Sequence, residues 1–321
     1  MSLTTMSPSS GAVARGKPAI RGAPLGRVDR PFRGIVLLMS STVFLAMSDA
    51  MAKYLAQSLP PIEIAWLRFS MFLLIMLPIV IRRPRAMKSI SPGVQALRGL
   101  AMLSSSVFFI SGLQFLPIAE ASATAFIAPI FVTALSIMFL GEKVGKRRWA
   151  ATLVGLIGVM IIVKPGTAAF HPAAILPILS ALGWAVTLVL TRRISGGDNV
   201  ITTMTYTALV GFFVLSAVVP LYWVTPTWQQ VAIGAAIGIA ATTGHWIVVL
   251  AFRYADASVL APFSYSQLVW VTLLGFVMFG EIPDIWTAVG AAIIIASGLY
   301  TAHRERVRRT AMVAAEPYPS V

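Results

Sequence analysis

Five ionisable side chains within otherwise apolar segments of the sequence are candidates for chemistry. They are Asp49, Lys53, Arg68, Glu120 and His245. A charged group inside hydrocarbon costs about 2.5–3.5 kcal/mol on insertion scales, so such groups are rare and usually serve a function. Proton exchange, ion pairing and recognition of a charged molecule are the kinds of chemistry that they can support.

The spacing of the first three charges leaves their roles open. Asp49 and Lys53 are four residues apart, which places them on one face of a helix. Either they neutralise each other, or Asp49 faces a cavity and takes a proton or a cation. An unpaired guanidinium at Arg68 would be costly, so a fixed ion pair with Asp49 or Glu63 is favoured over a binding role. Glu63 itself is expected to be solvated near the membrane surface.

Glu120 and His245 differ in how strongly they point to a function. Glu120 opens an apolar segment after Pro117, where a carboxylate ordinarily caps a helix, and this structural role is favoured. His245 lies deep in an apolar segment and is flanked by threonines, so the structural and functional interpretations are evenly balanced.

Aromatic and amide side chains recur at a similar depth and can stack on or hydrogen-bond to an organic molecule. They are Trp184, Trp246, Tyr265, Gln267 and Trp270. Helix packing is the alternative role, but a position facing a cavity is favoured for Tyr265 and Gln267. His245 and Gln267 are predicted to line that cavity near the middle of the membrane.

Several kinds of chemistry are absent from the sequence. The chain has no cysteine, which excludes thiol nucleophiles and disulfides, and its three histidines are too scattered to predict a metal site. It has no G-x-x-x-x-G-K-[ST] motif, the phosphate-binding loop of many ATPases. We therefore expect no cofactor, and a membrane-embedded enzyme ranks below transport. A non-transporting scaffold ranks third, because it would not require buried charges.

The composition requires lipid as a solvent. Of the 321 residues, 58% are hydrophobic and only 11% are charged, whereas roughly a quarter are charged in soluble proteins. Ten segments are apolar and long enough to cross a bilayer as helices. They are 34–55, 62–81, 98–116, 118–140, 148–163, 172–191, 200–223, 229–252, 257–279 and 284–302.

The distribution of basic residues predicts how these helices are oriented. The net charge is +14, yet all but three of the 25 lysines and arginines fall in the tails and alternate loops. The exceptions are Lys53, Arg68 and Lys164. Basic loops stay in the cytoplasm, so both termini are predicted to be cytoplasmic in the inner (plasma) membrane. This pattern accounts for the basic charge without a nucleic-acid partner.

Two stretches repeat the same order of residues. Residues 119–122 read Ala-Glu-Ala-Ser and 255–258 read Ala-Asp-Ala-Ser, and each stretch leads through an apolar run to a Gly-Glu pair. Cations follow the first Gly-Glu pair but not the second, so the copies are predicted to insert in opposite orientations, as in secondary transporters. Pro129 and Pro262 can each free a carbonyl and form a hinge or partial break.

Together these motifs resemble the drug/metabolite transporter superfamily, in its EamA-type family. The resemblance rests on the Gly-Glu endings at Glu142 and Glu281, the small-residue helix openings, and Pro61-x-Glu63 with Arg68. It implies an all-α membrane protein with ten transmembrane helices as two inverted five-helix repeats around a central cavity. It also implies alternating access without ATP, with export of amino acids or metabolites, or import of vitamins or nucleotide-like cofactors.

The predicted organisation and function follow from these observations. A disordered cytoplasmic tail over 1–33 is favoured over an organelle transit peptide, the repeats cover 34–164 and 171–302, and 303–321 form a cytoplasmic tail. We expect a secondary active transporter of a small amino-acid-like, aromatic or heterocyclic metabolite. Efflux is favoured, and uptake of a vitamin or nucleotide-like cofactor is the alternative. The expected partners are the solute and the lipid bilayer, and a homodimer is left open.

Overall fold

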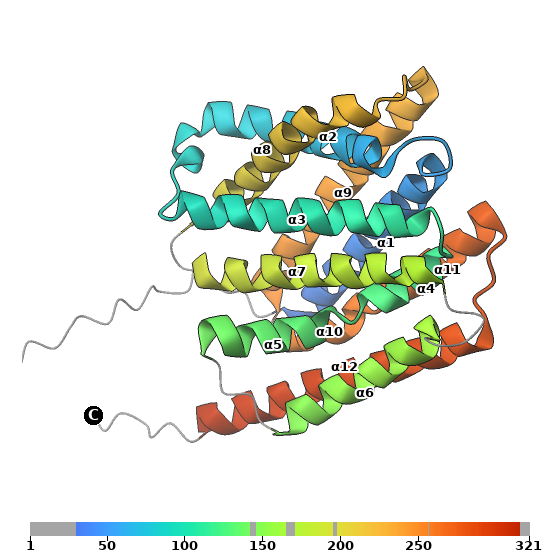
Figure 1. The fold of residues 1–321 in the computed structure, drawn as a ribbon. Helices are drawn as coiled ribbons and strands as arrows, with labels where there is room; N and C mark the ends of the chain where they lie inside the picture. The colour runs from blue at the N-terminus through green and yellow to red at the C-terminus, as the bar shows by residue number, and fades with distance from the viewer. Residues whose placement is uncertain (1–29, 142–145, 165–170, 195–197, 256, 315–321) are drawn as a thin grey trace, which may run out of the picture.

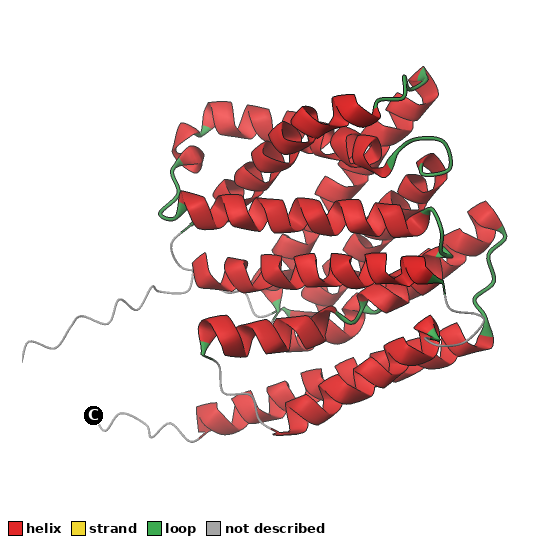
Figure 2. Cartoon of the chain, viewed as in Figure 1, coloured by secondary structure: helices red, strands yellow, loops and turns green. Residues whose placement is uncertain are grey.

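The computed structural model describes residues 30–141, 146–164, 171–194, 198–255 and 257–314. Within these ranges the regular elements are helices, and no strand is formed (Figure 2). The α-helices are α1 (Pro31–Leu55), α2 (Pro61–Arg82), α3 (Pro92–Leu113), α4 (Ile118–Ala125), α5 (Ala128–Leu140), α6 (Lys146–Val163), α7 (Ile175–Ile194), α8 (Val200–Val218), α9 (Trp228–Tyr254), α10 (Ala257–Ser264), α11 (Ser266–Phe279) and α12 (Ile285–Ala314). Short 3₁₀ helices cover Pro84–Met87, Pro172–Ala174 and Val219–Tyr222.

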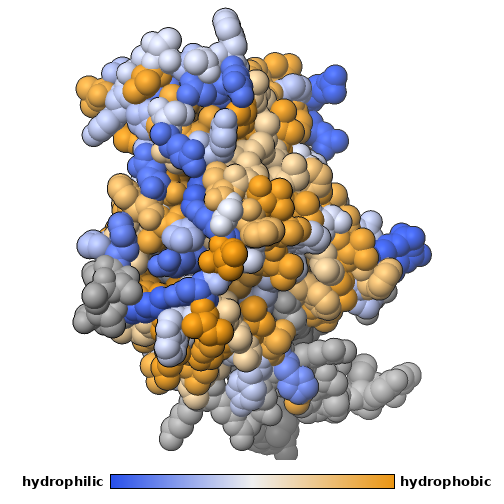
Figure 3. Space-filling model, turned by 90° about the vertical axis from the view of Figure 1, so that its right-hand side faces the viewer, coloured by the Kyte–Doolittle hydropathy of each residue, from blue (hydrophilic) through white to orange (hydrophobic). Residues whose placement is uncertain are grey.

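Much of the apolar surface of these helices is not buried inside the protein. Seven helical segments of the described chain are long and apolar enough to cross a membrane, counting 118–139 as one segment. Only 28% to 44% of the residues in their most apolar stretches are buried. Large side chains such as Leu74, Ile81 and Phe213 point outward, and apolar atoms are prominent in the space-filling view (Figure 3). Such an extensive apolar exterior needs lipid around it.

The interior, by contrast, holds many small polar side chains. The Thr42 hydroxyl on α1 lies 2.9 Å from that of Ser266 on α11, and the Ser105 hydroxyl on α3 lies 3.2 Å from that of Ser180 on α7. Small hydroxyl residues let membrane helices approach closely while satisfying their own hydrogen bonds. The protein is therefore apolar outside and partly polar inside.

The two halves of the chain are packed against each other rather than side by side as separate bodies. Helix α1 packs on α9, α3 on α7, α2 on α8, and α6 on α12, so every pair takes one helix from each half. Figure 1 shows α3 and α7 along the middle of the bundle and α6 with α12 along one edge. The interior is thus a shared interface between the two halves.

Both halves contain a broken helix at the corresponding place. Helix α4 ends at Ala125 before α5 begins, and α10 ends at Ser264 before α11 begins. The rings of Phe126 and Tyr265, one from each break, contact each other with centroids 5.0 Å apart. The expected breaks near Pro129 and Pro262 are confirmed, so the segments 118–140 and 257–279 are interrupted rather than continuous.

Each broken helix ends at a glycine in the left-handed conformation. Gly141 follows α5 with φ 65° and Gly280 follows α11 with φ 67°. Glycine adopts this conformation without the steric penalty of a Cβ atom, which is why it commonly ends helices. The same offset of 139 residues separates Phe126 from Tyr265 and Gly141 from Gly280. The two helix endings therefore have the same backbone geometry, at the positions of the paired Gly-Glu motifs.

The connections between helices lie at two ends of the bundle (Figure 1). One end, here called the basic end, holds the ends of α2 and α7 with Arg82, Arg83, Arg192 and Arg193. The opposite end holds the connections after α1, α3, α8 and α11. Basic residues thus concentrate at one end. Helix α12 continues to Ala314, into the region expected to form the C-terminal tail.

Candidate functional site

Four helices bring ionisable and amide side chains together inside the bundle. This polar centre consists of Asp49 on α1, Arg68 on α2, His245 on α9 and Gln267 on α11. The Gln267 side-chain amide donates a hydrogen bond to Asp49 Oδ2 at 3.1 Å. Arg68 lies close enough to interact electrostatically with both Asp49 and His245. Gln267 reaches Asp49 from the first turn of α11, directly after the helix break.

The two opposite charges of the polar centre are not in direct contact. Among the described residues, no ion pair within 4 Å joins Asp49 and Arg68. Instead, Arg68 Nη1 donates to the Ser106 hydroxyl at 3.4 Å, and Asp49 accepts from Gln267. The fixed ion pair expected for Arg68 is therefore replaced by neutral hydrogen-bond partners, so neither charge neutralises the other by contact.

Lys53 takes a partner other than Asp49. Its side chain is 8% exposed, forms an ion pair with Glu281, and donates to the Leu116 carbonyl oxygen at 2.8 Å. Of the two roles left open by the sequence, neutralisation of Asp49 by Lys53 is thus not observed. The carboxylate of Asp49 is left to the polar centre.

His245 lies in the polar centre with one ring nitrogen already engaged. Its Nδ1 is 2.7 Å from the Ala241 carbonyl oxygen of the preceding turn, and its ring contacts Trp184 edge-on at 6.2 Å between centroids. A neutral imidazole that donates from Nδ1 keeps Nε2 as an acceptor. His245 can therefore serve as a hydrogen-bond acceptor beside an indole ring.

Several buried polar atoms lack a hydrogen-bond partner. Among the described residues they include Trp270 Nε1 on α11 and Thr242 Oγ1 on α9. Leaving such a group unpaired costs roughly 1–3 kcal/mol. Trp270 lies one turn beyond Gln267 on α11, so an unsatisfied donor sits on the same helix as the polar centre.

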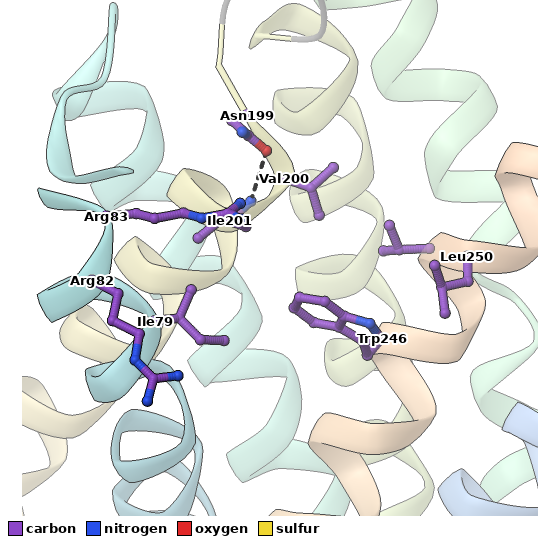
Figure 4. A pocket seen from close by; sticks show the side chains of 9 residues that line it. Ile79, Arg82, Arg83, Asn199, Val200, Ile201, Trp246 and Leu250 are labelled. Carbon is purple, nitrogen blue, oxygen red and sulfur yellow. Dashed lines mark hydrogen bonds between the residues drawn. The ribbon is translucent and has the colours of Figure 1, made fainter. Parts of the chain in front are cut away.

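Trp246 lines a cavity of about 490 Å³ that lies toward the basic end. Figure 4 shows Arg82 at the end of α2 and Arg83 directly after it on one side of the cavity, and Trp246 and Leu250 from α9 on the other. The start of α8 completes the wall, where Asn199 accepts a hydrogen bond from the Ile201 backbone N–H at 3.2 Å. Trp246 is thus separate from its neighbour His245: one lines this cavity and the other belongs to the polar centre.

Tyr265, for which the sequence favours a position facing a cavity, packs against aromatic and helical neighbours. Its side chain is buried at the helix break against Phe126. Its hydroxyl lies against α12, so close that a Cβ added at Gly298 would stand 1.7 Å from it. Tyr265 therefore packs the two breaks and α12 together.

Glu120 and Glu63, the other two carboxylates discussed in the sequence analysis, lie toward the opposite end. Glu120 is half-buried in the first turn of α4, within electrostatic range of Lys164, Asp284 and Lys53. Glu63, expected to be solvated, is instead fully buried. Its Oε2 accepts from the Val224 backbone N–H at 3.1 Å, because the connection after α8 folds over the start of α2.

A polar cluster near the basic end was not predicted from the sequence. Arg98 on α3 donates to the hydroxyls of Thr191 and Thr207, both at 2.6 Å. The buried Gln95, one turn earlier, donates to Asp198 at 2.8 Å. Burial alone would raise the pKa of Asp198, but hydrogen bonds from Ser89, the Ile90 backbone N–H and Gln95 lower it overall. The spacing of Gln95 and Arg98 on one helix face was the available signal.

Comparison with known proteins adds to this geometry. The EamA-like transporter family matches the chain twice, over residues 32–164 and 171–301. An S-adenosylmethionine uptake transporter of Rickettsia prowazekii is 30% identical over 274 residues, covering 85% of this chain and 93% of that protein. A riboflavin transporter of Vibrio cholerae is 29% identical, covering 83% and 92%.

Two further similarities are more distant. The pseudopaline exporter CntI of Pseudomonas aeruginosa is 25% identical, covering 82% of this chain and 93% of that protein. One solved crystal structure has a TM-score of 0.59 at 20% identity, covering 86% of this chain and 98% of that chain, and this likeness concerns the fold alone. The doubled family match spans most of the sequence, and the chain therefore belongs to the EamA-like transporter family.

Proposed function

We propose that this membrane protein is a secondary active transporter built from two inverted five-helix repeats, 34–164 and 171–302. The doubled family match and the paired helix breaks support this architecture. Ten crossings result when α4 with α5, and α10 with α11, each count as one broken helix. Arginines gathered at the basic end support cytoplasmic termini in an inner membrane.

This topology has a direct test. A reporter fused after residue 282 should read as periplasmic, and one fused after residue 146 as cytoplasmic. The same result at both positions would contradict inverted insertion of the repeats.

The solute is proposed to carry an amino-acid group together with an aromatic or heterocyclic ring. The observation that carries this proposal is the pair of unlike charges, Asp49 and Arg68, which share the polar centre without direct contact. An amino-acid group presents an ammonium and a carboxylate, which complement these two side chains. Trp184, beside His245, offers an indole surface for a ring.

The named relatives support this solute class. S-adenosylmethionine contains both an amino-acid group and a heterocycle, and several relatives at 30% identity are uptake transporters for it. We therefore place uptake before the efflux favoured by the sequence. The second candidate is a ring system without an amino-acid group, which the riboflavin transporters among the relatives favour.

The cavity lined by Trp246 provides a route between the polar centre and the basic end. His245 and Trp246 are adjacent on α9, so the polar centre and the cavity share this helix. Arg82 and Arg83 at its rim would attract anionic groups such as carboxylates. A solute released from the polar centre would leave, or enter, through this cavity.

Flux through the purified protein in liposomes tests the proposed function. Labelled S-adenosylmethionine, riboflavin and a neutral amino acid would be supplied in parallel, with the Arg68→Gln variant as the matched control. We expect S-adenosylmethionine to move fastest and Arg68→Gln to reduce its flux more than tenfold. Flux of all three solutes that is no faster with the parental protein than in protein-free liposomes, or that is the same for Arg68→Gln as for the parent, would contradict the proposal.

A further inference from the structure

A buried ion pair joins the two halves of the chain at the opposite end of the bundle. Lys53 lies in the last turn of α1, and its partner Glu281 follows α11. Lys53 also donates to the Leu116 carbonyl oxygen, and Glu281 Oε2 accepts from the Ile118 backbone N–H at 3.0 Å. The pair therefore ties the end of α1 and both sides of the α3–α4 connection to the end of α11.

The backbone after α11 places Glu281 for this contact. Gly280 adopts the left-handed conformation, its N–H donates to the Phe276 carbonyl oxygen at 2.9 Å, and the Glu281 N–H donates to the Gly275 carbonyl oxygen at 3.1 Å. This helix ending turns the chain back on itself. The ammonium of Lys53 also lies 5.3 Å from the centroid of the Phe279 ring. Both charged groups are thus held from several sides.

The two ends of the bundle differ: a cavity lies toward the basic end, and polar contacts accompany the ion pair at the opposite end. A cavity of about 490 Å³ lies toward the basic end. At the opposite end, further contacts accompany the ion pair: Gln114 donates to the Ala56 carbonyl oxygen at 3.0 Å, and Glu63 accepts from Val224. Lys53 is one turn from Asp49, or about 6 Å along α1 by helical rise. Lys53 therefore lies one helical turn nearer the opposite end than Asp49 of the polar centre.

We propose that the Lys53–Glu281 ion pair is the gate that closes the transport path at the opposite end, and that it opens and reforms in each cycle. This proposal rests on the transport function proposed above. The physical reason is the balance of energies in a buried ion pair. Its desolvation cost nearly offsets its attraction, and both charges regain their hydration when water enters. Such a contact can close tightly and still open at a small net cost.

Distances between spin labels across this end provide the test. The chain has no cysteine, so labels can be attached at Gln57→Cys and Ile282→Cys without other changes. Both positions are exposed at the opposite end, and they belong to different halves. Double electron–electron resonance of the protein in lipid nanodiscs would then report whether this end is closed or open.

The expected results distinguish a gate from a structural contact. The parent should give one dominant short distance. Glu281→Gln strands the Lys53 charge, and we expect it to at least double the population at longer distances. Lys53→Met combined with Glu281→Gln removes both charges and keeps an acceptor for Ile118, so the short distance should dominate again.

The matched control is a second ion pair at the same end. Lys164 pairs with Asp284, which lies three residues after Glu281. Because Asp284 is exposed, this second ion pair should stabilise the closed end only weakly. Asp284→Asn should leave the distance distribution unchanged. Should Glu281→Gln not fold, Glu281→Asp retains the charge on a shorter side chain and should open partially.

Two outcomes would overturn the gate. They are a parental distance distribution in folded Glu281→Gln or Glu281→Asp protein, or equal opening in the Asp284→Asn control. The measurement needs no solute, so it separates the gate from the proposed function. If the distances shift as expected while the parent moves no solute, the proposed transport function is contradicted. The proposal that this ion pair controls the opening of the end is then still supported.

Discussion

The two helix breaks have the same backbone design but carry different side chains. Both place an aromatic residue at the break and end the following helix at a left-handed glycine. At the offset of 139 residues, Gln267 in the second half corresponds to Ala128 in the first, and Trp270 corresponds to Phe131. Gln267 hydrogen-bonds to Asp49, whereas Ala128 is part of the apolar core.

This difference shows how a repeated fold acquires a single site. The repeat supplies geometry: each break ends one helix and starts another inside the bundle. Of the four residues of the polar centre, only Gln267 lies at a break, and it contacts Asp49 of the first half. The two breaks thus share their backbone geometry, but a polar side chain reaches the polar centre from the second alone.

The largest effect is expected for the charge that Gln267 contacts. Asp49→Asn removes a carboxylate whose charged hydrogen bonds are worth about 1.5–3 kcal/mol each, so flux should fall roughly 10- to 100-fold. Adding Arg68→Gln to Asp49→Asn should lower flux by a smaller factor than Arg68→Gln does in the parent, because the two charges sense each other. A double-mutant cycle of flux measures this coupling, and strict additivity of the two losses would contradict it.

The same cycle distinguishes a competing role for Asp49. If Asp49 carries the coupling proton, the double variant stays inactive and flux no longer responds to an imposed pH gradient. Uptake after a pH jump, measured for the parent and both variants, separates the two roles.

An intermediate effect is expected when the second break is made to resemble the first. Gln267→Ala removes the hydrogen bond to Asp49, and flux should fall on the order of tenfold while the amount of folded protein is unchanged. The control is Ala128→Ser at the corresponding position, which should keep flux within about twofold, since a small polar group there meets no site residue. Similar flux losses in both variants would contradict the asymmetry.

A smaller and symmetric effect is expected at the glycines that end the broken helices. A Cβ added at Gly141 or Gly280 would meet no atom within 4 Å, so alanine there carries only a conformational cost. Each substitution should lower the free energy of unfolding by about 1–2 kcal/mol. Thermal unfolding in detergent measures this, and a cost at only one glycine would show that the backbones are not equivalent.

The sequence predicted the apolar segments and the helix breaks because these depend on local patterns. Proline, glycine and runs of apolar residues act within a few turns of their own positions. The partner of Lys53 was not predictable in this way, since Glu281 lies 228 residues away and only the packing of the two halves brings them together.

The burial of Glu63 could not be predicted from the sequence for a similar reason. Its position at the start of a helix suggested solvent, but the connection that covers it comes from the second half of the chain. Arg98 was missed because it stood at the edge of a predicted segment and was counted with the basic loops. Lys53, Glu63 and Arg98 all owe their surroundings to contacts between distant segments.

The smallest effect concerns the exposed ion pair at the opposite end. Burial alone would raise the pKa of Asp284, but hydrogen bonds from Lys164 and Thr287 lower it from 3.8 to about 2. The stability that it contributes is therefore complete above about pH 4 and is lost as the pH falls toward 2. Asp284→Asn should cost less than about 1 kcal/mol at neutral pH.

The pH dependence of that small cost is the informative part. The difference in melting temperature between parent and Asp284→Asn should stay constant from about pH 5 to 8 and shrink below about pH 4. A difference that vanishes between pH 5 and 7 would show that another group sets the charge of this contact.

The most direct test of the account is solute efflux from liposomes that contain the purified protein. The liposomes would be loaded with a metabolite extract, and mass spectrometry would follow what leaves. We expect at least one solute with an amino-acid group and a ring to leave faster from parental liposomes than from those with Asp49→Asn. Identical efflux of every metabolite from both preparations would contradict transport through the polar centre.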